Sequence, residues 1–111
     1  MTKYLFLYRN PPGPDRQPSP EEMQQMFAQW NTWKEKWKTS VVSVGDGLKH
    51  GGRILKDGKV TDGPTVEAKE IIGGFSIIQA ESYEQAVEVA RECPIVHMPN
   101  SVIEIREMMG F

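Results

Sequence analysis

The sequence has few of the features that mark secreted or membrane proteins. Cys93 is the single cysteine in 111 residues, which excludes an intrachain disulfide and indicates a reducing compartment. No apolar run approaches the roughly 20 residues that a membrane-spanning helix needs. The apolar stretch near the N-terminus is shorter than a signal-peptide core and has no small-residue cleavage site. We therefore expect a cytoplasmic protein without a membrane partner, folded as one domain over residues 1–111.

A strong charge of one sign is also absent, since 13 basic and 15 acidic residues give a net charge of −2. Such a chain has no general attraction to nucleic acid, and we expect no nucleic-acid partner. The two histidines, His50 and His97, have no metal-ligand spacing. The glycines of residues 45–52 match neither a dinucleotide fingerprint nor a phosphate loop. The sequence thus predicts no metal and no cofactor.

The N-terminal third predicts a strand, a loop and a helix. Residues 3–9 alternate aromatic and leucine side chains, as in a central strand that is apolar on both faces. Residues 10–20 hold five of the eight prolines and predict either a connecting loop or a mobile lid. Ser19 then caps an amphipathic helix that ends near Lys38. Its apolar stripe consists of Met23, Met26, Phe27, Trp30, Trp33 and Trp37. Core packing is the favoured interpretation of the tryptophans, and stacking on a ligand is the alternative.

The middle of the chain predicts strands and turns. Residues 41–44 are strand-like, and the glycines that follow predict a turn with close backbone approach. Asp57 and Gly58 predict the tight turn of a hairpin over residues 53–61, because they tolerate positive φ angles. Residues 71–80 predict a second central strand, in which the glycine pair at 73 and 74 leaves room for another backbone or a ligand.

The C-terminal part predicts a helix over residues 82–93, with a capping box formed by Ser82 and Gln85. Its cysteine, Cys93, is expected to be an inert packed thiol. Residues 94–101 predict a loop, and residues 102–106 predict the last strand. The order of elements is that of an α+β protein with a ferredoxin-like βαββαβ antiparallel sheet and two helices on one face. The other face is apolar, so we expect a second copy to cover it, as in a dimeric α+β barrel.

Residues 62–64 (Asp-Gly-Pro), 67–70 (Glu-Ala-Lys-Glu) and 73–75 (Gly-Gly-Phe) carry a family resemblance. With the closing strand at 102–106, they make the chain similar to the YCII-related family, in its DGPF branch. Thr65 stands where that branch has its name-giving phenylalanine. The resemblance covers most of the chain and implies a ferredoxin-like homodimer with a cleft near the Asp-Gly-Pro turn.

The resemblance also implies two settings for such a protein. Some relatives act on small aromatic molecules, and DGPF relatives often occur beside extracytoplasmic-function sigma factors. Members of the wider family are suspected of His/Asp chemistry that uses a histidine on the first helix. The first predicted helix here contains no histidine, so any such chemistry has to use other residues.

Four residues are candidates for a site. Asp62 either caps its turn or acts as a general base, and His97 is either a surface histidine or its partner in an acid/base dyad. The two meet only if the 94–101 loop folds over the strands ending at Asp62. Arg53 or Lys69 would then hold an anionic group of the substrate, and the alternative for both is solvated surface charge.

These observations leave two functional hypotheses, beside the alternative of a dimer whose cleft is degenerate. The first is a homodimer that binds a small polar organic molecule in a cleft, with weak lyase- or hydrolase-type activity at Asp62 and His97. The second is a non-catalytic regulatory or interaction module, linked through the resemblance to sigma-factor-type transcription regulation. The residues themselves do not decide whether the protein is an enzyme.

Overall fold

A computed structural model of the chain describes residues 1–11, 18–63 and 70–111. Its elements in chain order are β1 (Thr2–Asn10), α1 (Pro20–Lys36), β2 (Val41–Gly47), β3 (Gly52–Lys56), β4 (Lys59–Gly63), β5 (Ile71–Ala80), α2 (Tyr83–Arg91), the 3₁₀ helix η1 (Pro94–His97) and β6 (Val102–Glu107). The predicted loop over residues 10–20 lies mostly outside the described residues.

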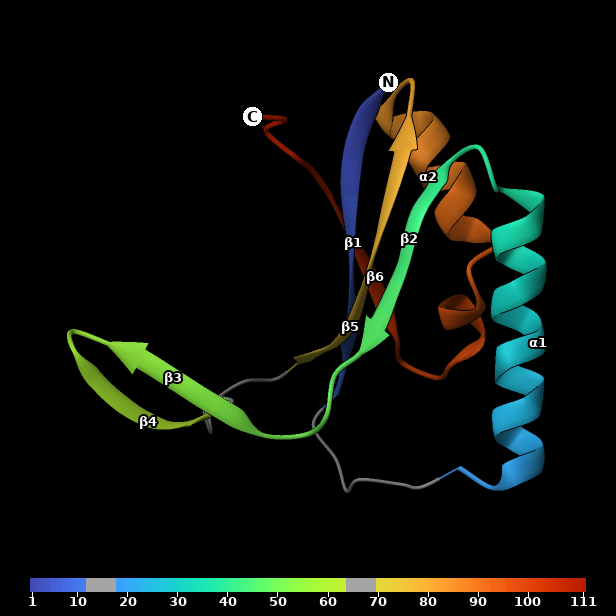
Figure 1. The fold of residues 1–111 in the computed structure, drawn as a ribbon. Coiled ribbons are helices and arrows are strands. Elements are labelled where there is room, and N and C mark those ends of the chain that lie inside the picture. Colours follow the sequence, from blue (N-terminus) through green and yellow to red (C-terminus); the bar gives the residue numbers. More distant parts are fainter. Residues whose placement is uncertain (12–17, 64–69) are drawn as a thin grey trace.

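Four strands form one sheet in the order β2-β5-β1-β6, and every neighbouring pair is antiparallel. The helices α1 and α2 lie on one face of this sheet (Figure 1). This arrangement confirms the predicted ferredoxin-like α+β fold. The strands β3 and β4 form a separate two-stranded sheet, inserted in the chain between β2 and β5. Asp57 and Gly58 have φ angles of 51° and 76° at its tip, as the predicted tight turn requires.

The core lies between the sheet and the helices. Alternate residues of β1 point to it, so Tyr4, Phe6 and Tyr8 are buried. From β5, Ser76 and Ile78 are buried on the same face. Burial of an aromatic or branched side chain contributes about 1.5–3 kcal/mol, so these positions supply much of the driving force for sheet formation. In α2 the inward residues are Ala86, Val89 and Ala90.

Both α-helices begin where the sequence predicts. The side chain of Ser19 accepts a hydrogen bond from the Glu22 amide, and Glu22 accepts one from the Ser19 amide. At α2 only half of the predicted box forms. Ser82 Oγ accepts from the Gln85 amide, but the side chain of Gln85 accepts from the amide of Glu81.

The two ends of α1 are packed differently. Trp33 is buried, and its indole N–H donates to the Val89 carbonyl at 2.9 Å. Towards the N-terminus of the helix, Met23, Met26 and Phe27 are exposed. The predicted apolar stripe is therefore only partly core, because the N-terminal half of α1 stands away from the sheet (Figure 1).

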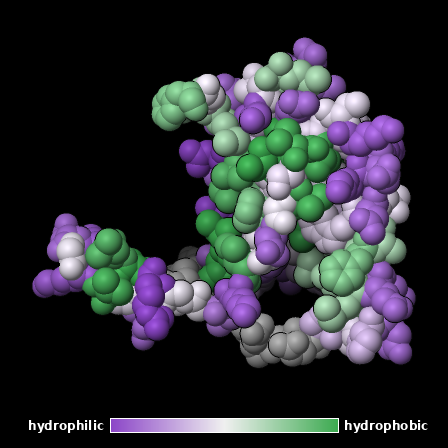
Figure 2. Space-filling view, viewed as in Figure 1, coloured by the Kyte–Doolittle hydropathy of each residue, from purple (hydrophilic) through white to green (hydrophobic). Residues whose placement is uncertain are grey.

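The sheet face opposite the helices is also apolar. Leu5 pairs with Ile77 and Leu7 pairs with Phe75 across β1 and β5, and all four side chains are half-buried. Figure 2 shows apolar side chains gathered over the sheet on the side away from α1. Within residues 1–11, 18–63 and 70–111, no helix covers this face (Figure 1). Over the same residues, no helix has the length and apolar character needed to cross a membrane.

Candidate functional site

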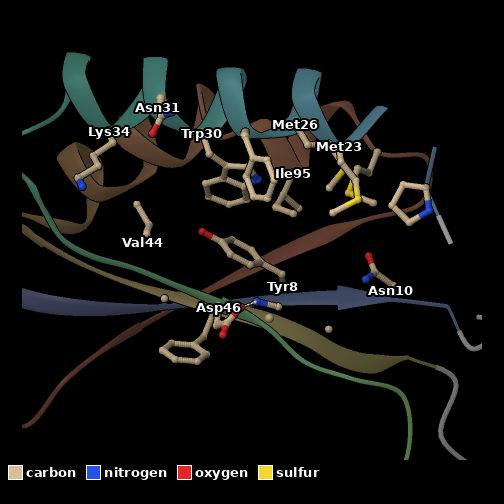
Figure 3. Close-up of a pocket in the computed structure, with 18 residues that line it drawn as sticks. Tyr8, Asn10, Met23, Met26, Trp30, Asn31, Lys34, Val44, Asp46 and Ile95 are labelled. Carbon is tan, nitrogen blue, oxygen red and sulfur yellow. Dashed lines mark hydrogen bonds between the residues drawn. The ribbon is translucent and has the colours of Figure 1, made fainter. Parts of the chain in front are cut away.

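A cavity of about 460 Å³ separates the N-terminal half of α1 from the sheet. Figure 3 shows side chains entering it from α1 on one side and from the strands on the other. Its size falls within the about 300–1,000 Å³ that is common for small-molecule pockets. The described residues that line it are Tyr8, Asn10, Pro18, Met23, Met26, Phe27, Trp30, Asn31, Lys34, Val44, Gly45, Asp46, Gly47, Gly73, Gly74, Phe75, Ile95 and Met98.

The walls of the cavity are aromatic and aliphatic. The rings of Tyr8 and Trp30 lie 5.9 Å apart, and Trp30 meets Trp33 edge to face at 5.5 Å. Because Trp33 is buried and hydrogen-bonded, this contact holds Trp30 in place. Met23 and Met26 add flexible thioether side chains, which adapt to ligands of different shape. The lining of the cavity is therefore mainly apolar.

Glycines form part of its floor. A Cβ at Gly74 would lie 3.0 Å from the carbonyl oxygen of Asp46 and 3.3 Å from Cδ2 of Tyr8. Gly45 has φ +69°, and a Cβ there would lie 1.8 Å from the carbonyl oxygen of Phe75. The close backbone approach predicted from the glycines is confirmed. However, β2 continues to Gly47, so the predicted end of the strand near Val44 was wrong.

The hydroxyl of Tyr8 takes part in a buried network of hydrogen bonds. It donates to Ser76 Oγ at 2.6 Å, and Ser76 Oγ donates to the Val44 carbonyl at 2.7 Å. The Cys93 thiol lies 3.5 Å from the same hydroxyl. Burial raises the pKa of the Tyr8 phenol far above its usual range, and burial also raises the pKa of the Cys93 thiol. Both groups stay protonated at neutral pH, so Cys93 is a packed thiol, as predicted, and Tyr8 serves as a wall.

Polar groups stand at the ends of the cavity. Figure 3 shows Lys34 and Asn31 of α1 towards one end, and Asn10 of β1 towards the other. Asn10 Oδ1 accepts a hydrogen bond from Ser101 Oγ at 2.8 Å. Asp46 Oδ1 accepts one from the Gly47 amide at 2.8 Å. Lys34 is the one basic side chain among the described lining residues, and it could meet the anionic end of a ligand.

The predicted site residues lie elsewhere. Asp62 is on β4, where its Oδ1 lies 3.4 Å from Nη1 of Arg53 and its side chain is 94% exposed. His97, at the end of η1, lines a smaller cavity of about 320 Å³ beside Trp33 and the ion pair of Lys36 with Glu92. Lys69 lies outside the described residues.

Within one chain, the described residues do not bring Asp62 and His97 together. The hairpin that carries Asp62 extends away from the sheet on the side opposite α1, whereas η1 lies on the helix side (Figure 1). The catalytic dyad of Asp62 and His97 stays a prediction, and measurements of activity would test it. In the described part of the chain, no group of three or more His, Cys, Asp or Glu side chains could hold a metal ion.

The residues of the large cavity were not among the site residues predicted from the sequence. The available signals were the apolar stripe of α1, which continues through Met23, Met26 and Phe27, and the glycine pair at 73 and 74. The stripe was longer than the core could bury.

Two comparisons with known proteins bear on this site. The model of the YCII-related domain matches residues 3–111. Among curated proteins, none matches the chain. The family match extends over all elements of the fold and over both cavities.

Proposed function

Because the chain belongs to the family of YCII-related domains, we propose that it is a homodimer that binds a small organic molecule in the cavity between α1 and the sheet. One observation carries this proposal. The cavity is open although exposed apolar side chains of α1 line it, and closing the helix onto the sheet would have buried them. An apolar surface kept open in this way is typical of a binding pocket.

The lining supports a ligand with an apolar body and one anionic end. Tyr8, Trp30 and Phe27 provide aromatic surface for the body. Lys34 provides a cation, and Asn31 on the same helix provides amide donors. The sequence predicted a small polar organic molecule, and the ligand proposed from the lining differs in having an apolar body, because few polar side chains line the cavity.

A thermal-shift screen tests ligand binding. A ligand that binds only the folded state stabilises it by about 2.7 kcal/mol at 100 times its Kd. For a domain of this size, we expect a rise of several degrees in melting temperature. Quenching of tryptophan fluorescence should accompany the rise and be lost in Trp30→Phe. A broad panel of aromatic and aliphatic carboxylates without any stabilising compound would contradict the proposal.

The open sheet face supports the homodimer. Leu5, Leu7, Phe75 and Ile77 form an apolar surface in the middle of the sheet, and a second copy would bury it. Analytical ultracentrifugation should give twice the mass of the chain. A charge in the centre of this surface, Leu7→Asp, should shift the protein towards monomer. The control variant Gln25→Asp, at an exposed position of α1, should not. A wild-type protein that sediments as a monomer at every concentration would contradict the dimer.

The second candidate, an interaction module without a ligand, is favoured by a different observation, the exposed apolar pair of Leu55 and Val60 on the hairpin. The two candidates differ in the screen described above. An interaction module would gain no stability from small molecules, but it would still self-associate.

A further inference from the structure

The β3–β4 hairpin extends from the body of the molecule and exposes apolar side chains. It leaves the four-stranded sheet on the side opposite α1 and α2 (Figure 1). Leu55 and Val60 pair across its two strands and are 71% and 63% exposed. A single two-stranded hairpin is at best marginally stable in water. A further contact over this apolar pair would stabilise the hairpin.

The two faces of the hairpin differ. Ile54 is only partly exposed and packs over Gly63, where an added Cβ would lie 3.0 Å from Ile54 Cγ1. Side chains alternate along a strand, so Leu55 and Val60 project from the other face, together with the ion pair of Arg53 and Asp62. This second face combines apolar side chains with a charged rim, which is the composition of a contact surface.

The described part of the same chain does not supply that contact. The large cavity lies on the helix side of the sheet, and the hairpin extends to the other side (Figure 1). No hairpin residue lines either described cavity. Gly51 and Gly52, with φ of +87° and +155°, form the bend at its base, and the chain there points away from α1 (Figure 1).

Three apolar features lie on one side of the molecule. They are the hairpin, the open sheet face around Leu7, and the C-terminal segment, in which Met109 and Phe111 are exposed. Figure 1 shows the hairpin and the C-terminal segment near opposite ends of the sheet, both extending to its open side. Figure 2 shows apolar side chains on the sheet and on the hairpin from this view. A second copy docked on the open face would lie between the hairpin and the C-terminal segment.

We infer that the β3–β4 hairpin is an arm that packs its Leu55–Val60 face against a second copy of this chain. The inference rests on the sheet-to-sheet dimer proposed above and adds a contact to it. In a two-fold dimer each chain provides one arm and receives one, so the contact is made twice. The exposed ion pair of Arg53 and Asp62 would then lie at the edge of the interface.

Photo-cross-linking tests the arm directly. The photoreactive residue p-benzoylphenylalanine replaces Leu55, and in a matched control it replaces Thr61, which lies on the other face of the hairpin. Mixed ¹⁴N and ¹⁵N chains show whether a cross-linked peptide joins two chains. We expect cross-links between chains from position 55 and about tenfold fewer from position 61, because the cross-linker reacts only within contact distance.

A charge variant supplies a second readout. Leu55→Asp combined with Val60→Asp should weaken the dimer about tenfold or more, since charges would replace the apolar contact of the arm. Thr61→Asp should leave the dimer unchanged. If wild type is a dimer but position 55 reacts only within its own chain or not at all, the arm is wrong and the dimer stands. If wild type is a monomer throughout, the dimer and the arm both fail.

Discussion

The Tyr8 hydroxyl on β1 donates a hydrogen bond of 2.6 Å to Ser76 Oγ on the neighbouring β5. Both groups are buried on the helix face of the sheet, and Ser76 Oγ in turn donates a hydrogen bond to the Val44 carbonyl on β2. The network therefore links three adjacent strands. It also keeps the polar end of Tyr8 occupied, so the ring faces Trp30 as an apolar wall.

Removing the hydroxyl should cost stability. Tyr8→Phe deletes the hydrogen bond to Ser76 and the longer, weak one from the Cys93 thiol, but leaves that of Ser76 to Val44. We expect a loss of about 1 kcal/mol in the free energy of unfolding, most of it from the bond to Ser76. Urea denaturation at pH 7 measures it. A variant as stable as wild type would show that the Tyr8 hydroxyl adds no net stability.

The stability of wild type should fall at alkaline pH. Burial raises the pKa of Cys93 and of Tyr8 above their ordinary values of 9.0 and 10.0. From about pH 9, the unfolded chain loses these protons while the folded chain keeps them, so unfolding becomes more favourable. Urea denaturation between pH 7 and 11 should show this fall. In Tyr8→Phe the fall in the free energy of unfolding above pH 10 should be smaller than in wild type. If this free energy falls equally with pH in the two proteins, Tyr8 is not one of the groups responsible.

Gly45 and Gly51 form a matched pair for testing the floor of the cavity. Both have positive φ, but only at Gly45 would a Cβ meet another backbone, at 1.8 Å from the Phe75 carbonyl oxygen. Gly51→Ala should cost about 1–2 kcal/mol, because alanine is strained in this conformation. Gly45→Ala should cost about 2 kcal/mol more, because β2 and β5 must also separate. Thermal denaturation measures both, and equal losses would contradict the close approach.

Lys34 is predicted to select for an anionic ligand. Lys34→Met keeps the length and apolar stem of the side chain but removes the charge. For a carboxylate ligand found in the screen, we expect binding weaker by about tenfold to a hundredfold in calorimetry, since a hydrogen bond to a charged group contributes about 1.5–3 kcal/mol. The neutral amide of the same ligand should bind both proteins equally. Lys38→Met, on the turn after α1, is the control, and an equal loss there would indicate a general charge effect.

Asp62 and His97 remain predicted as an acid/base dyad. If they act together, Asp62→Asn and His97→Gln should each abolish turnover of a ligand, and the double variant should lose no more than either single one. The dimer should persist in both variants. If turnover is unchanged in one of these variants, the residue replaced in it has no role in catalysis. A Lys34→Met variant with normal turnover but weaker binding would place recognition and chemistry in separate regions.

Local patterns were sufficient to predict most of the fold. Ser19 with Glu22, Ser82, and Asp57 with Gly58 each predicted a boundary that the structure has, because caps and tight turns depend on neighbours in the chain. The alternation in β1 predicted a central strand for the same reason. The extension of β2 through Gly45 was missed, because its cause is contact with Phe75, thirty residues away in the sequence.

The candidate site was less predictable. Asp62 and His97 were selected for their chemistry, and the sequence did not show that β4 and η1 would lie on different sides of the sheet. Nor did it show that the apolar stripe of α1 packs on the core only at its three tryptophans, which leaves Met23, Met26 and Phe27 beside an open cavity. The sequence by itself determined the two α-helices, the strands, their order and the family, but not the 3₁₀ helix η1 or the full length of β2. The tertiary structure alone decided which apolar side chains became core, cavity wall or exposed arm, because burial depends on packing between residues distant in the chain.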